Sequence, residues 1–169
     1  MNIHRVLVVT AVIASVYGCY LPISGSVIDA ETQQPIEGAV VLAEWTKTKG
    51  YGFTYTESYK VVEAVSDKEG KVKIEGCLCL FTNPPDVTVY KKGYVAWNNK
   101  FIFPKYEKRT DYMRQNDSDF KLYKYQDTYS RKDHISFIHG SINYGLTGSQ
   151  KKSIEDAIRW EQLESVKDK

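Results

Sequence analysis

The chain has 169 residues, of which 42% are hydrophobic and 26% charged, and its formal net charge is +2. This length allows one domain with a core of its own plus an appendage, and excludes two full domains of typical size. The Lys and Arg residues are spread along the chain rather than clustered, so we expect no nucleic-acid partner. The 13 tyrosines favour a β-rich fold, because tyrosine suits strands and can keep its hydroxyl group at a wet edge.

The first residues have the pattern of an export signal. Arg5 is followed by an apolar run from Val6 to Val16 that is interrupted only by Thr10 and Ser15. A membrane-spanning helix needs ~20 apolar residues, so this shorter run is typical of a signal-peptide core instead.

The end of this run suggests which kind of signal it is. Val16-Tyr17-Gly18-Cys19 resembles the bacterial lipoprotein signal, in which a cysteine is acylated and becomes the first residue of the mature protein. We therefore predict a signal peptide over residues 1–18 and lipid attachment at Cys19. Tyr20, in place of Asp, resembles the pattern that is sorted to the outer membrane of Gram-negative bacteria. The alternative is an ordinary secretory signal with an incidental Cys19.

The other two cysteines are Cys77 and Cys79. Side chains two residues apart on a strand point to the same face, but their Cβ atoms lie farther apart than the ~3.8 Å that a disulfide needs. We therefore expect two reduced, packed thiols. No second cysteine pair and no suitably spaced histidine accompanies them, so we predict no metal site and no other cofactor.

The segment from Ile23 to Trp45 predicts a strand, a turn and a second strand. Ile23, Gly25 and Val27 alternate with polar residues, residues 31–35 form a polar turn, and residues 39–45 are an apolar run short enough for one buried strand. This hairpin is expected to begin a β-sandwich.

Further strands are expected along the chain as far as residue 123. We predict them over 59–65, 71–75, 87–91, 97–103 and 120–123, which gives roughly seven strands in total, the number expected of a small sandwich. Residues 46–58 suit a long connection or a twisted ribbon, and residues 104–118 a surface loop.

Four motifs in this region occur in an order that carries a resemblance. They are Gly25-Ser-Val-Ile-Asp29, Pro35-Ile-Glu-Gly-Ala-Val-Val41, Ser66-Asp-Lys-Glu-Gly-Lys-Val-Lys-Ile74 and Val89-Tyr-Lys-Lys-Gly-Tyr94. The ordered set resembles the carboxypeptidase regulatory-like domain, a transthyretin-like (prealbumin-like) antiparallel β-sandwich of seven strands. The resemblance implies a sandwich over residues 19–124 and a non-catalytic module of the kind that accompanies enzymes, receptors or surface lipoproteins. It transfers no catalytic residue, because the motif glycines have structural roles.

The composition changes after Tyr125, and residues 125–169 predict a helical extension. Ser130-Arg-Lys-Asp133 fits a helix-start capping box, followed by Ile135, Ile138 and Ile142 on one helical face. Ser149 is a plausible cap for a second helix with an apolar face of Ile154, Ala157 and Ile158. We expect two short helices that pack on the sandwich or its edge.

The sequence contains few candidate catalytic groups. His134 and His139 are five positions apart and differ by ~140° around a helix, so they would not converge on one site. We expect both to be surface or partly packed side chains. No elbow-type serine motif and no phosphate-binding glycine loop is present in the sequence, so we predict no enzyme.

Two functions remain. The first is a non-catalytic, lipid-anchored protein of the bacterial cell envelope, at the outer membrane, with a structural or protein-interaction role. The second is a module that binds carbohydrate or peptide through exposed aromatic side chains, with an envelope protein or glycan as its partner. The aromatic residues concerned are Tyr51, Phe53, Tyr55, Tyr59, Tyr90, Tyr94 and Trp97.

Overall fold

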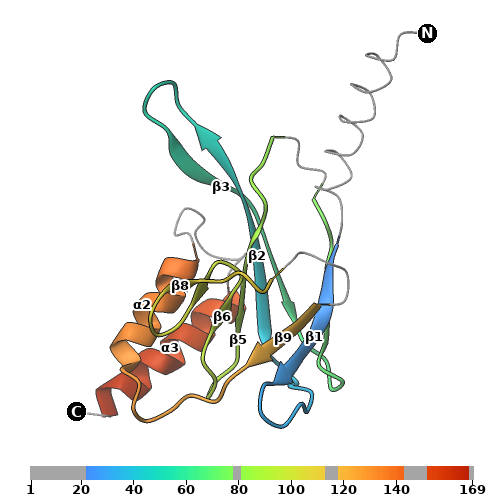
Figure 1. The fold of residues 1–169 in the computed structure, drawn as a ribbon, viewed down its shortest axis with the longest axis vertical. Helices are drawn as coiled ribbons and strands as arrows, with labels where there is room; N and C mark the ends of the chain where they lie inside the picture. Colours follow the sequence, from blue (N-terminus) through green and yellow to red (C-terminus); the bar gives the residue numbers. More distant parts are fainter. Residues whose placement is uncertain (1–21, 78–80, 113–117, 143–151, 168–169) are drawn as a thin grey trace.

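The computed structural model describes residues 22–77, 81–112, 118–142 and 152–167. They form three layers: a three-stranded sheet, a four-stranded sheet, and two helices packed on the outer face of the four-stranded sheet (Figure 1). The predicted fold class, a mainly β protein built as a β-sandwich with a helical appendage, is confirmed.

The three-stranded sheet has the order β4-β1-β9, with β1 at Ile23–Asp29, β4 at Lys71–Ile74 and β9 at Ser118–Leu122. Strand β4 pairs with β1 in the antiparallel sense, whereas β9 pairs with β1 in the parallel sense. The expected antiparallel arrangement therefore does not hold for β1 and β9. The alternation of β1 is as predicted, with Ile23 and Val27 buried.

The four-stranded sheet has the order β3-β2-β5-β6 and is entirely antiparallel. Its strands are β2 (Val40–Lys49), β3 (Tyr55–Val65), β5 (Asp86–Tyr90) and β6 (Trp97–Asn98). Strand β2 is covered on both faces, because Val41 and Ala43 pack against the three-stranded sheet while Val40 and Leu42 pack under the helices. Burial on both faces explains the continuous apolar run of this strand.

The predicted strand 97–103 is broken in two. The side-chain Oδ1 of Asn98 accepts hydrogen bonds from the N–H groups of Lys100 (2.8 Å) and Phe101 (3.1 Å), which turns the chain after β6. Strand β7 (Phe101–Ile102) then pairs with β8 (Glu107–Lys108). The predicted surface loop 104–118 therefore contains a short strand.

Strands β2 and β3 continue past the sandwich as a two-stranded ribbon, which projects from the body of the molecule (Figure 1). Strand β5 pairs with β2 only as far as Glu44, and the register of β2 and β3 shifts at Trp45 and Thr46. Beyond that bulge, the ribbon continues until Lys49 pairs with Tyr55. Of the two predicted forms of residues 46–58, the twisted ribbon is the observed one.

The helices are α2 (Arg131–Ser141) and α3 (Lys152–Lys167). The predicted cap of α2 is confirmed, since the Ser130 hydroxyl accepts a hydrogen bond from the N–H of Asp133 (3.2 Å). Ser149, the expected cap of the second helix, lies outside the described residues. At the start of α3, the carboxylate of Glu63 on β3 accepts hydrogen bonds from the N–H groups of Ser153 and Ile154 (both 3.0 Å), so the sheet itself caps this helix.

A second core lies between the helices and the four-stranded sheet. Its members include Leu42 and Tyr90 from the sheet and Phe137, Ile138 and Ile154 from the helices. The helices thus cover a face of the sheet rather than an edge. His134 also points into this layer and is fully buried, so the expected surface or partly packed position is wrong for this histidine.

Cys77 forms a disulfide, so the expectation of two reduced thiols is wrong. The chain has only two other cysteines, Cys19 and Cys79, and both lie outside the described residues. Cys77 follows the end of β4 and is not part of a strand, so the extended geometry that would keep neighbouring cysteines apart is not imposed on it. Within the described ranges, no helix is both long enough and apolar enough to cross a bilayer.

Candidate functional site

The predicted lipid-attachment residue, Cys19, lies outside the described residues. Four of the predicted ligand-contact residues, Tyr51, Phe53, Tyr55 and Tyr59, are exposed on the ribbon formed by β2 and β3.

The other three aromatic residues are elsewhere. Tyr90 is fully buried under the helices, and Trp97 is buried between the sheets, so the expectation of an exposed binding surface is wrong for these two. Tyr94 is half-buried and donates a hydrogen bond from its hydroxyl group to Oδ2 of Asp29 (3.1 Å). The structure therefore does not bring the seven side chains onto one face.

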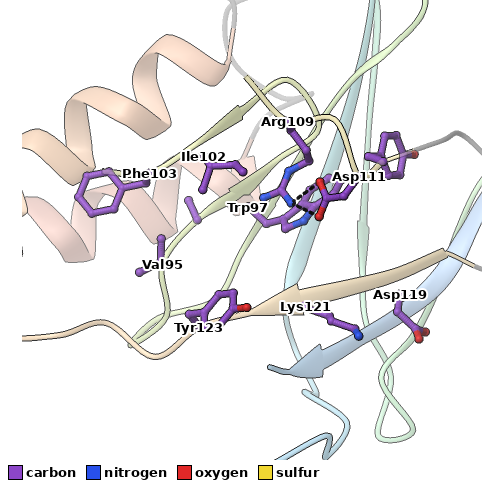
Figure 2. A pocket seen from close by; sticks show the side chains of 11 residues that line it. Val95, Trp97, Ile102, Phe103, Arg109, Asp111, Asp119, Lys121 and Tyr123 are labelled. Atoms are coloured by element: carbon purple, nitrogen blue, oxygen red, sulfur yellow. Dashed lines mark hydrogen bonds and ion pairs between the residues drawn. The ribbon is translucent and has the colours of Figure 1, made fainter. Parts of the chain in front are cut away.

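A cavity of about 400 Å³ lies between strand β6 of one sheet and strand β9 of the other (Figure 2). Trp97, Ile102 and Phe103 contribute apolar surface to it, while Asp119, Lys121 and Tyr123 line it from the β9 side. The volume falls in the range of small-ligand sites. The two sheets meet here at their edges, which leaves room that neither sheet fills.

Arg109 is fixed at this cavity by several contacts. Its Nε donates a hydrogen bond to the carbonyl oxygen of Asn98 (2.7 Å), and its Nη1 lies 3.1 and 3.2 Å from the two carboxylate oxygens of Asp111 (Figure 2). The guanidinium group lies 4.7 Å from the centre of the Trp97 ring. These contacts leave Arg109 little freedom to bind a ligand, and they hold the segment after β8 against β6.

The edge of β9 that faces away from β1 lies on the side of the cavity. The carbonyl of Leu122 faces β1 and accepts a hydrogen bond from Ala30, whereas the carbonyl of Tyr123 faces the opposite side and accepts one from Val95. Because backbone groups alternate along a strand, the N–H and C=O groups of Asp119 and Lys121 also face away from β1. The cavity can therefore accept an amphipathic group beside a strand edge, which is the chemistry of an extended peptide.

A cluster of buried polar groups lies between α2, α3 and β5. Glu161 of α3 is fully buried, and its Oε1 accepts a hydrogen bond from the Tyr90 hydroxyl (2.7 Å) and lies 3.3 Å from Nδ1 of His134. Its Oε2 lies 3.2 Å from Nη1 of Arg131. One carboxylate thus contacts side chains from α2 and from β5.

His134 links this cluster to the backbone of the sandwich. Its Nε2 accepts a hydrogen bond from the N–H of Ala96 (2.9 Å), so this nitrogen carries no proton. The proton of the neutral ring is then on Nδ1, the atom that faces Glu161. Sequence reasoning missed this arrangement, although Glu161 continues the apolar series of Ile154 and Ile158 at helical spacing, and an acid on an apolar face is a signal for a buried partner.

The cluster also sets the charge of its members. Burial alone would raise the pKa of Glu161, but its contacts with His134, Tyr90 and Arg131 outweigh burial and hold that pKa below its usual range. Burial, reinforced by the neighbouring Glu161, raises the pKa of the Tyr90 hydroxyl.

Asp29, which lies outside this cluster at the end of β1, also has a lowered pKa. Hydrogen bonds from the backbone N–H of Thr32, and then of Glu31, lower the pKa of Asp29 against the opposing effect of burial.

We expect the free energy of unfolding to decrease on acidification. A carboxylate whose pKa is lowered by folding contributes stability that is complete above its unfolded pKa, about 4, and is lost as the pH falls through the folded pKa. Both Glu161 and Asp29 belong to this class. Urea denaturation between pH 7 and pH 2 measures the effect, and Glu161→Gln should flatten the decrease. An equally steep decrease in this variant would contradict the role given to Glu161.

The cluster is suited to holding the helices on the sheet rather than to chemistry on a substrate. Glu161 and His134 are both fully buried, and their contacts join α3 and α2 to β5 and to the backbone at Ala96. Among the residues that the structure describes, no group of three or more His, Cys, Asp or Glu side chains is placed to hold a metal ion. No family model, no curated protein and no solved structure matches the chain.

Proposed function

We propose that the chain is a non-catalytic, lipid-anchored protein of the bacterial cell envelope, with a structural or protein-interaction role at the outer membrane. The observation that carries this proposal is Gly18-Cys19 at the end of a short apolar run, only four residues before strand β1 begins at Ile23. An acylated Cys19 would hold the sandwich next to the bilayer with almost no linker. Several acyl chains, at ~0.8 kcal/mol per buried CH₂, suffice for stable attachment.

We also propose that the sandwich is of the carboxypeptidase regulatory-like type. The two main sheets contain three and four strands, which agrees with the seven expected. Two motif glycines occupy positions that support a structural role for the motif. Gly70 has a φ of +72° in the turn before β4, and a Cβ on Gly25 would collide with the carbonyl oxygen of Ser118 on β9.

The disulfide of Cys77 supports a location outside the cytoplasm, because disulfides persist in oxidising compartments such as the periplasm. It also constrains the proposal. A sulfur atom that carries a lipid cannot take part in a disulfide, so an acylated Cys19 requires that Cys77 be bonded to Cys79. A bond between Cys77 and Cys19 would exclude the lipid anchor.

The buried polar groups support a structural role. Glu161 pairs with Arg131 of α2 and accepts a hydrogen bond from Tyr90 of β5, and these contacts join the helices to the sandwich. Interaction with a partner would then fall to the cavity between β6 and β9 and to the exposed ribbon.

The Cys19→Ala variant tests the anchor. Wild-type protein, expressed in a Gram-negative host, is expected in the membrane fraction after an alkaline carbonate wash, and the variant is expected in the supernatant, because only the lipid holds the chain against such a wash. Cys79→Ala, the same substitution at another cysteine, is the control and should remain in the membrane fraction. Wild-type protein released by the wash, or a Cys19→Ala variant that is retained after residues 1–18 have been removed, would refute the anchor.

A further inference from the structure

The end of the ribbon formed by β2 and β3 presents two aromatic side chains to solvent. Tyr51 has an exposed fraction of 106% and Phe53 of 96%, so neither rests on any other part of the described structure. The backbone holds them in this position through Gly50 and Gly52, whose φ values are +109° and +81°. A Cβ on Gly50 would collide with the carbonyl oxygen of Phe53, so the turn depends on glycine.

The charge of the ribbon suits a lipid surface. Between Trp45 and Thr56 the ribbon has two lysines and no Asp or Glu, and Lys49 is paired with Glu57 of β3, so Lys47 carries the net positive charge of the ribbon. Aromatic side chains favour the boundary between headgroups and acyl chains, and lysines beside them are attracted to anionic headgroups. A fully exposed Phe at the end of a ribbon is otherwise unfavourable in water.

The ribbon projects from the same end of the sandwich at which β1 begins (Figure 1). At the base of the ribbon, Lys60 pairs with Trp45, and its Nζ donates a hydrogen bond to the carbonyl oxygen of Gly76 (3.5 Å). Gly76 lies two residues after Ile74, and Ile74 pairs with Ile23, the first residue of β1. The proposed anchor and the aromatic tip therefore belong to one end of the molecule.

The ribbon is also supported at its base. Asn83 donates a hydrogen bond from its backbone N–H to the carbonyl oxygen of Thr46 (2.8 Å), and its Nδ2 donates to the hydroxyl groups of Thr46 (3.0 Å) and Thr48 (3.1 Å). From Trp45 to Lys49, the last paired residue of β2, the ribbon extends about 13 Å at ~3.3 Å per residue. A supported ribbon of this length can hold its tip away from the body of the sandwich.

We propose that residues 50–54 form a membrane-contact tip that places Tyr51 and Phe53 at the headgroup boundary of the bilayer. This inference rests on the proposed function, since the anchor at Cys19 brings that end of the sandwich to the membrane. The tip is a second, weaker point of attachment that fixes the orientation of the domain. Lipid anchors commonly act together with a second signal of this kind.

The test uses the full chain with Phe53→Trp, incubated with vesicles of phosphatidylethanolamine and phosphatidylglycerol that carry bromine atoms on their acyl chains. Bromine quenches only nearby tryptophan emission. Of the three native tryptophans, Trp45 and Trp97 are buried and give little signal change, and the emission of the half-buried Trp160 on α3 is subtracted with the wild-type chain as reference. The matched control is Tyr123→Trp, at an exposed aromatic position on the β9 side of the molecule.

We expect a blue-shifted and quenched emission from Phe53→Trp and neither effect from Tyr123→Trp. Equal quenching in the two variants, or a chain that does not sediment with the vesicles, would overturn the inference and leave the tip to a protein or glycan partner. The acyl mass of the same sample separates the two proposals. Quenching without an acyl group would refute the anchor alone, and an acyl group without quenching would refute the tip alone.

Discussion

Replacement of Glu161 by alanine is expected to lower the free energy of unfolding by about 3–5 kcal/mol, the usual cost of breaking a buried ion pair from one side. The change would leave the Tyr90 hydroxyl, Nδ1 of His134 and the Arg131 guanidinium without the carboxylate that they share. Because these groups come from β5 and α2, the loss would affect the packing of both helices on the sheet. Urea denaturation of the full chain, followed by circular dichroism, measures the effect.

Two further variants make this result specific. Glu161→Gln keeps an oxygen for the Tyr90 hydroxyl but loses the charge opposite Arg131, so we expect a loss smaller than that of Glu161→Ala. Glu155→Ala changes an exposed carboxylate in the first turn of the same helix and should cost less than about 1 kcal/mol. Equal effects of Glu155→Ala and Glu161→Ala would refute the docking role of the buried cluster.

Replacement of Gly25 by alanine is expected to lower the free energy of unfolding by about 2–3 kcal/mol, through overpacking. The added Cβ would collide with the backbone of Ser118, the first residue of β9, and would also contact the Phe120 ring. Since Ser118 is the partner of Gly25 in the parallel ladder, either β1 or β9 must shift. The backbone cannot move aside as a flexible side chain would.

The same substitution at Gly140 should have the opposite sign. Gly140 lies in α2, and a Cβ there would meet no atom within 4 Å. Alanine is favoured over glycine in a helix by about 0.5–1 kcal/mol, so Gly140→Ala should raise the free energy of unfolding. Chemical denaturation of the two variants side by side measures both signs. A Gly25→Ala variant as stable as the wild type would contradict the close approach of β1 and β9.

The elements that the sequence predicted well are those set by local patterns. The apolar run of β2, the alternation of β1 and β4, and the Ser130 cap all depend on residues within a few positions of each other. The parallel pairing of β1 with β9 could not be predicted, because it joins Gly25 to Ser118 across more than half of the chain. The break after β6 arises from one side chain, that of Asn98, which accepts hydrogen bonds from the backbone N–H groups that follow it.

The candidate sites were predicted less well, because burial of an amphipathic side chain is decided by its neighbours in space. Tyr90 and Tyr51 are the same residue type, yet one is fully buried beside Glu161 and the other lies fully exposed on the ribbon. Likewise, His134 is buried because α2 packs against the backbone at Ala96, a contact that no local pattern reveals. The cavity between β6 and β9 depends on how two sheets meet at their edges.

Mass spectrometry of the mature protein, digested without reduction, tests the lipid anchor most directly. We predict an N-terminal peptide that begins at Cys19 and carries the mass of the acyl groups, together with a separate peptide in which Cys77 is bonded to Cys79. A peptide in which Cys77 is bonded to an unacylated Cys19 would contradict the lipid anchor and leave an ordinary exported protein.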